Sequence, residues 1–231
     1  MPHISLNRCV QRTRDWLGQD CQLCGEESAT ELICASCAAD LPVLPPHCPQ
    51  CALPGSGGVT CGECLKRPPH FDATLALWHY GFPCDRLVRS LKYHARLALA
   101  AFFARSLASR PLRPVDLVLP MPLHPRRLAE RGFNQALEIA REIAQRARVP
   151  LGPCAAQRVK DTAQQTGLPY DRRAGNVRGA FACNEDLSGM TVAVVDDVMT
   201  TGATLNELAR ILKRSGAARV ENWVIARALP P

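Results

Sequence analysis

Apolar residues along positions 70–231 fall into two kinds of pattern, short unbroken runs and stripes at helical spacing. The runs have the length and composition of buried strands, and they lie at 74–80, 116–121, 191–195 and 219–226. The stripes repeat every three or four residues, and they lie at 85–92, 95–109, 132–147 and 201–215. Because strands alternate with helices, the pattern predicts an α/β fold with a parallel sheet covered on both faces.

The first 69 residues differ, because paired cysteines replace the apolar periodicity there. Eight of the twelve cysteines form four C-x-x-C pairs, and nine residues separate the two pairs of each half. The pairs are Cys21/Cys24, Cys34/Cys37, Cys48/Cys51 and Cys61/Cys64. Two such pairs complete a tetrahedral site with Zn–S distances of about 2.3 Å, so we predict two structural Zn2+ sites in a double zinc ribbon. The ligands pair either sequentially or in a cross-braced manner, and the repeat favours sequential pairing.

This zinc module is predicted to have little core of its own, because Pro and Gly are frequent between positions 42 and 58. Metal binding is expected to supply its folding energy. The module has no aromatic residue between Cys21 and Cys64, and residues 1–69 hold 5 Lys/Arg against 7 Asp/Glu. Nucleic-acid binding needs stacking and positive charge, so a role in packing or in protein contact is favoured for this module. The remaining cysteines are predicted to be small core or surface residues, and they are Cys9, Cys84, Cys154 and Cys183.

A chain of 231 residues suits one domain of about 150 residues with a small appendage. We expect an N-terminal segment at 1–19, the zinc module at 20–67 and the larger domain at 70–231. The larger domain holds 23 Lys/Arg against 14 Asp/Glu. This excess favours an anionic partner such as a phosphate or nucleic acid, and a basic surface without any partner is an equal alternative.

The expected cellular location follows from two kinds of segment that the sequence lacks. No apolar stretch approaches the roughly 20 residues that a membrane span needs. The first ten residues also lack the apolar centre of a signal peptide. We therefore expect a cytoplasmic protein without membrane insertion, and reduced thiols in that compartment argue against a disulfide framework.

The segment at 192–204 carries the clearest chemistry. Four apolar residues precede Asp196 and Asp197, and a loop of small hydroxyl residues then leads into a helix. Open α/β sheets bind ligands at the carboxyl ends of their strands, and the amides at a helix start favour a phosphate. The two carboxylates are suited to accept hydrogen bonds from vicinal sugar hydroxyls. The segment thus predicts a ribose 5-phosphate site, and the alternative is an acidic turn before an ordinary helix start.

This segment resembles the phosphoribosyl diphosphate (PRPP) fingerprint of the type I phosphoribosyltransferases, an apolar strand followed by an acidic pair and T-T-G-x-T. The resemblance implies a phosphoribosyltransferase-like domain in which Asp196 and Asp197 act in catalysis by binding the ribose 2′- and 3′-hydroxyls. It also implies that the 5-phosphate is held by Thr200, Thr201, Gly202, Ala203 and Thr204. In that family Mg2+ accompanies PRPP and bridges its diphosphate and ribose oxygens.

Three further blocks, together with the cysteine module, resemble the competence-protein ComF family, also called the GntX-like family. The blocks are L-K-Y-H at 91–94, P-M-P-L-H-P-R-R at 120–127 with R-G-F-N-Q at 131–135, and Q-Q-T-G-L at 164–168. The resemblance implies diphosphate contacts from Lys92, Met121, Leu123, Arg126, Arg127 and Arg131. A solvated basic turn is the alternative for these arginines. A mobile loop is implied at 158–176, with contacts from Lys160, Gln165 and Arg172.

Two function classes follow. The first is a Mg-dependent phosphoribosyltransferase that binds PRPP, acts on an unidentified acceptor and is linked to DNA uptake or utilisation. The second is a non-catalytic accessory protein that senses a nucleotide or binds single-stranded DNA. Both aspartates and the whole Thr-Gly loop are present, which favours PRPP binding. A salt-dependent gel shift with single-stranded DNA discriminates the second class.

Overall fold

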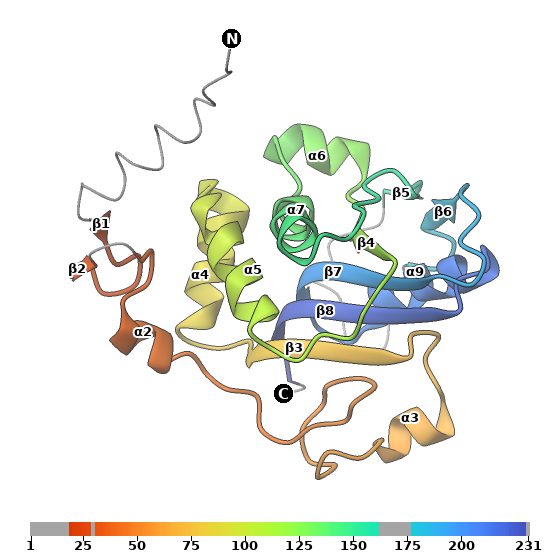
Figure 1. Ribbon diagram of the computed structural model, residues 1–231, viewed down its shortest axis with the longest axis horizontal. Helices are drawn as coiled ribbons and strands as arrows, with labels where there is room; N and C mark the ends of the chain where they lie inside the picture. Colours follow the sequence, from red (N-terminus) through yellow and green to blue (C-terminus); the bar gives the residue numbers. More distant parts are fainter. Residues whose placement is uncertain (1–18, 29–30, 162–176, 230–231) are drawn as a thin grey trace.

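A four-stranded parallel sheet forms the centre of the protein (Figure 1). The computed structural model describes residues 19–28, 31–161 and 177–229. The strands of the sheet are β3 (Ala73–His79), β4 (Leu117–Pro120), β7 (Thr191–Met199) and β8 (Arg219–Arg227), in the order β3–β8–β7–β4. Each of the four predicted strands is present, and the predicted α/β class with a parallel sheet is confirmed.

Helices cover both faces of this sheet, as the alternating pattern predicts. The helices on one face are α4 (Cys84–His94), α5 (Ala98–Ala108) and α7 (Gln135–Ala147), and α9 (Ala203–Arg214) covers the other (Figure 1). Alternate residues of β7 belong to two apolar cores, one on each face of the sheet. Ala193 packs with α4, α5 and α7, and Val194 packs with α9. Among the described helices, none has the length and apolar character that a membrane span requires.

Strand β7 is longer than predicted. The apolar run ends at Val195, but pairing with β8 continues as far as Met199 opposite Arg227. Backbone pairing with β8 therefore extends the strand through two acidic residues that local preference does not favour in a strand. Consequently Asp196 and Asp197 lie inside β7, not after its end.

Several short elements were not predicted. The segment for which a solvated basic turn was the alternative forms helix α6 (Pro125–Arg131), which begins with a proline after His124 and ends at Gly132 with φ of 80°. Helix α7 consequently starts at Gln135, three residues later than expected, where the Asn134 side chain accepts from the amide of Ala136 at 3.0 Å. A small antiparallel pair, β5 (Ala156–Arg158) and β6 (Phe181–Cys183), is also present.

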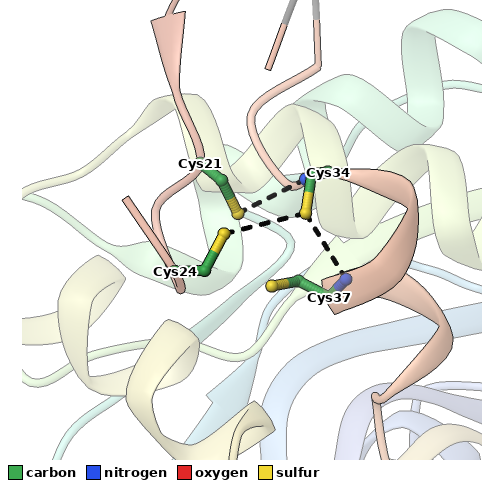
Figure 2. Close-up of side chains that lie close together, drawn as sticks. All are labelled: Cys21, Cys24, Cys34 and Cys37. Carbon is green, nitrogen blue, oxygen red and sulfur yellow. Dashed lines mark hydrogen bonds between the residues drawn. The ribbon is translucent and has the colours of Figure 1, made fainter. Parts of the chain in front are cut away.

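The eight paired cysteines gather into two separate clusters. Each cluster holds the two consecutive pairs of one repeat, with all four Sγ atoms within 4.8 Å of one another. Sequential pairing is therefore correct, and cross-bracing is excluded. The short elements around the clusters are β1 (Gln19–Asp20), β2 (Glu27–Ser28) and α2 (Ala35–Ala39) in the first ribbon and α3 (Gly62–Lys66) in the second. Figure 2 shows the four thiols of the first cluster turned toward a common centre.

The geometry of both clusters fits zinc. Zn–S bonds of about 2.3 Å in a tetrahedron place the sulfur atoms about 3.8 Å apart. The Sγ atoms of Cys24 and Cys34 are 3.8 Å apart, and those of Cys51 and Cys61 are 3.7 Å apart. Although burial acts in the opposite direction, backbone amides lower the pKa of Cys21 to about 6, which favours the thiolate that zinc requires.

Each ribbon packs against a different face of the sheet. In the first ribbon, Cys21 and Ile33 share a core with Leu87 of α4 and with α5. In the second ribbon, Cys51 and Cys64 share a core with α9 and with the opposite face of the sheet. The ribbons thus complete two apolar cores that belong to the larger domain, which compensates for the small core within each ribbon.

We expect two zinc ions per chain in metal analysis, and each ribbon should respond differently to loss of a ligand. Cys51→Ser should lower the free energy of unfolding by about 3 kcal/mol or more, because its cluster is buried against the sheet. Cys24→Ser is the matched control, since Cys24 is exposed and its loss should cost less. Denaturant unfolding measures both effects, and equal losses for the two variants would contradict this account.

Candidate functional site

A cavity of about 290 Å³ opens at the edge where the parallel strands end. Its lining includes Tyr80 directly after β3, Met121 directly after β4 and Asp196 near the end of β7. Ligands of open α/β sheets bind at this edge, because side chains from several parallel strands converge there. The topology therefore brings residues from distant parts of the chain into one cavity.

The β7–α9 loop (residues 200–202) and the start of α9 form one wall, where Thr200 and Thr204 line the cavity. Gly202 caps α9 with a left-handed φ of 80°, and an added Cβ would lie 2.6 Å from Cε of Met199. Gly202 supplies no capping side chain, although Oγ1 of Thr201 accepts from the amide of Ala203 at 3.3 Å. The positive end of the α9 dipole therefore lies beside the cavity, where it favours an anion.

Asp196 and Asp197 point to opposite sides of β7, because side chains alternate along a strand. Asp196 lines the cavity, and its Oδ1 accepts a hydrogen bond from the amide of Asp197 at 2.8 Å. Asp197 is buried and does not line the cavity. Burial, together with the charge of Asp197, raises the pKa of Asp196 to about 7. Of the predicted carboxylate pair, the structure thus brings one member directly to the cavity.

Asp197 acts on the cavity through Lys92. The Lys92 Nζ lies 2.8 Å from the Asp197 Oδ1, and the side chains are only 21% and 4% exposed. Burial lowers the pKa of Lys92, but the charge of Asp197 and its hydrogen bond raise it more. Lys92 itself lines the cavity, so the buried pair holds a charged ammonium group at this site.

Three arginines add positive charge to the same cavity. Arg127 and Arg131 come from α6, and Arg158 ends β5. Arg131 is held in place by Gln135, whose Oε1 accepts from it at 2.5 Å, and its guanidinium lies 5.6 Å from the ring centre of Tyr93. Burial, and then the charge of Arg127, lowers the pKa of Arg158. These cations face a single lining carboxylate among the described residues, so the cavity favours an anion.

The remaining predicted contacts differ in their positions. Leu123 lines the cavity, whereas exposed Arg126 bonds to Glu130 at 3.1 Å and to Asp161 at 3.3 Å. Lys160 donates to the carbonyl of Arg178 at 3.1 Å. Gln165 and Arg172 fall outside the described residues. Their assignment as ligand contacts stays a prediction.

Five lining residues had no predicted contact role, and they are Tyr80, Tyr93, Gln135, Arg158 and Val198. Tyr93 and Gln135 belong to the sequence blocks already noted, so membership of those blocks was a usable signal for both. Arg158 reaches the site through the β5–β6 pair, which periodicity did not reveal.

Two domain families match this chain, and solved structures align with part of it. Residues 16–65 match the double zinc ribbon domain family, and residues 134–229 match the phosphoribosyl transferase domain family. Among solved structures, glutamine PRPP amidotransferase from B. subtilis aligns with a TM-score of 0.43 and 17% identity, over 59% of this chain and 30% of that chain. A purine phosphoribosyltransferase from Pyrococcus horikoshii aligns with a TM-score of 0.32 and 15% identity, over 67% and 87%.

Sequence relatives extend over both parts of the chain. DNA utilization protein YhgH of Salmonella typhi is 36% identical over 206 residues, which cover 85% of this chain and 91% of that protein. Competence protein F of Haemophilus influenzae is 28% identical over 219 residues, or 90% of each chain. Competence protein ComFC of Bacillus subtilis is 27% identical over 210 residues, covering 86% and 85%. The chain therefore belongs to the family of the DNA utilization protein YhgH and the competence proteins F and ComFC, and joins a double zinc ribbon to a phosphoribosyltransferase-type domain.

Proposed function

We propose that this protein binds PRPP in the cavity at the sheet edge and transfers its phosphoribosyl group to a nitrogen acceptor, in a process of DNA uptake or utilisation. One observation carries the proposal. The cavity combines a Thr-Gly loop at a helix start and the carboxylate of Asp196 with the cations Lys92, Arg127 and Arg131. A sugar that bears phosphate at one end and diphosphate at the other matches this division of polar groups. The link to DNA rests on the names of the relatives.

In the proposed complex, the β7–α9 loop receives the 5-phosphate because helix-start amides and hydroxyls favour a dianion. Asp196 accepts hydrogen bonds from the ribose hydroxyls. The C1–O bond then breaks, diphosphate leaves with the bonding electrons, and the acceptor nitrogen bonds to C1 and loses a proton. Lys92, Arg127 and Arg131 stabilise the negative charge that develops on the departing diphosphate.

A magnesium ion fits this site only as a companion of the ligand. Mg2+ prefers oxygen ligands and keeps several waters. Asp196 is the one carboxylate that lines the cavity within the described residues, so PRPP oxygens would supply most of the coordination. When bound, the ion would neutralise part of the charge on the diphosphate.

A non-catalytic nucleotide sensor is the second candidate. It is favoured by the position of Asp197, which is engaged with Lys92 and does not face the cavity. One carboxylate in the cavity can accept hydrogen bonds from a ribose without any reaction, whereas the proposed transfer also requires departure of diphosphate. Product formation therefore separates the two functions.

The direct test is release of diphosphate from PRPP and Mg2+ in the presence of a panel of nucleobases and amines. An enzyme should release diphosphate with at least one acceptor, and Arg127→Met should slow that release, because one positive charge is lost near the leaving group. PRPP binding without release by any acceptor would support the sensor. Absence of PRPP binding would reject the proposed transfer.

The two aspartates should respond differently to amide substitution. Asp196→Asn should weaken PRPP binding by about ten-fold or more, because charged hydrogen bonds to the ribose are lost. It should also stabilise the free protein at pH 8 by about 2–4 kcal/mol, since burial disfavours its ionised form. Asp197→Asn should instead destabilise the protein by about 3 kcal/mol, because it leaves the Lys92 charge unpaired. Calorimetry and denaturant unfolding measure these effects, and identical behaviour of the variants would contradict them.

Ligand binding should also release a proton near neutral pH. The pKa of Asp196 in the free protein is raised to about 7, so the group is largely protonated at pH 6. Ribose hydroxyls donate to the ionised carboxylate, so PRPP affinity should rise as the pH increases from 6 to 8. Calorimetry at pH 6 in two buffers of different ionisation enthalpy measures the released proton. Asp196→Asn corrects for protons that leave PRPP itself, and an equal release by this variant would contradict the assignment.

A further inference from the structure

The second zinc ribbon is connected, through hydrogen bonds to a buried arginine of the larger domain, to the loop that forms the cavity wall. Its first pair of ligands flanks a tight knuckle, residues 48–51, which we call the second knuckle. Three successive residues of this knuckle contact the larger domain. The Pro49 carbonyl accepts from the amide of Thr74 at 3.0 Å, and the Gln50 Nε2 donates to the Phe71 carbonyl at 3.3 Å.

The third contact is made by Arg227 at the end of β8. Its Nε donates to the Cys51 carbonyl at 2.9 Å, and its Nη1 donates to the carbonyls of Met199, at 3.0 Å, and Thr200. The Arg227 side chain is only 1% exposed. A single buried guanidinium thus joins the zinc-ligand residue Cys51 to the last residue of β7 and the first residue of the β7–α9 loop.

Packing reinforces this connection. Phe71, whose carbonyl is bonded to the second knuckle, also lies against Gly202, since a Cβ added there would be 3.8 Å from the Phe71 ring. Cys51, Phe71, Met199 and Leu205 belong to the same apolar core. The loop that would hold the 5-phosphate therefore rests on residues whose position depends on the second knuckle.

The physical consequence follows from the chemistry of arginine. A buried guanidinium is costly unless acceptors satisfy it, and its planar fork holds those acceptors at fixed separations. The Cys51 carbonyl is one of these acceptors. Zinc that binds the Cys51 thiolate also holds the carbonyl of the same residue in place. Loss of the second zinc would release this carbonyl and loosen the loop carbonyls bonded to the same group.

We propose that Arg227 is a positioning residue that couples the second zinc site to the β7–α9 loop, so that PRPP affinity depends on zinc in the second ribbon. This inference rests on the proposed function, because PRPP is the ligand measured. The first ribbon supplies an internal control. It packs against α4 and α5 on the opposite face, where Arg105 pairs with Glu31 at 2.8 Å.

The test uses the full-length zinc-loaded protein and two matched pairs of variants. Arg227→Lys keeps the charge, but one ammonium cannot reproduce the planar fork. Arg219→Lys is its control, because Arg219 lies on the same strand and bonds to Glu221, away from the loop. Cys51→Ser perturbs the second zinc, and Cys24→Ser perturbs the first. Zinc content, hydrogen exchange of residues 199–204 and PRPP binding are measured for each.

Arg227→Lys should retain two zinc ions, exchange its loop amides faster and bind PRPP about ten-fold more weakly or worse, because one or more buried carbonyls lose a charged donor. Cys51→Ser should show the same faster exchange with Arg227 intact. Neither Arg219→Lys nor Cys24→Ser should accelerate the exchange of the loop amides. A folded Arg227→Lys protein with unchanged exchange and affinity would overturn the coupling, and so would equal loosening by Cys24→Ser.

A further measurement covers the case in which Arg227→Lys or Cys51→Ser does not fold. In Cys24→Ser, chelation of the remaining zinc should accelerate exchange of residues 199–204, and unchanged exchange would overturn the proposal. The outcomes also separate the two proposals. If the loop responds as expected but the wild type does not bind PRPP, the coupling stands and the proposed function fails.

Discussion

Parallel pairing of β7 with β8 is the constraint on which the site depends. Because this pairing continues to Met199 opposite Arg227, β7 does not end where its apolar residues end. The alternation of the strand then directs Asp196 to the cavity and Asp197 toward Lys92. The same register places Arg227 next to the point where the chain leaves the sheet for α9. One set of backbone hydrogen bonds thus orients the carboxylates and supports the loop.

The distribution of charge in the cavity explains why its residues are suited to a ligand and not to stability alone. Lys92, Arg127, Arg131 and Arg158 line one small space. Asp197 offsets one of these charges internally, and Asp196 is held with a raised pKa. Ionisation of Asp196 near neutral pH costs free energy, and perturbed carboxylates of this kind are typical of functional sites. The proposed ligand, with two phosphate-bearing ends and free hydroxyls, would supply complementary charge and hydrogen-bond donors.

The sequence predicted the sheet and the zinc clusters because both have strong local signals. Four apolar runs identified the strands, and the repeated C-x-x-C spacing identified the ligands of both ribbons. The end of β7 was missed, since pairing with β8 is a tertiary effect that overrides the low strand preference of Asp196 and Asp197. Helix α6 was missed because its arginines form no apolar stripe. Arg158 was missed as a lining residue because β5 and β6 pair across residues that are far apart in the chain.

The role of the zinc ribbons follows from where they bury their apolar residues. A ribbon of this size cannot build a core alone, so metal replaces the missing burial. Here each ribbon also adds to one of the two cores around the sheet, through Cys21 and Ile33 on one face and Cys51 and Cys64 on the other. Zinc therefore stabilises residues well beyond its own ligands. Since the second core also includes Met199 and Leu205, which flank the β7–α9 loop, the metal and the cavity share one packed region of the molecule.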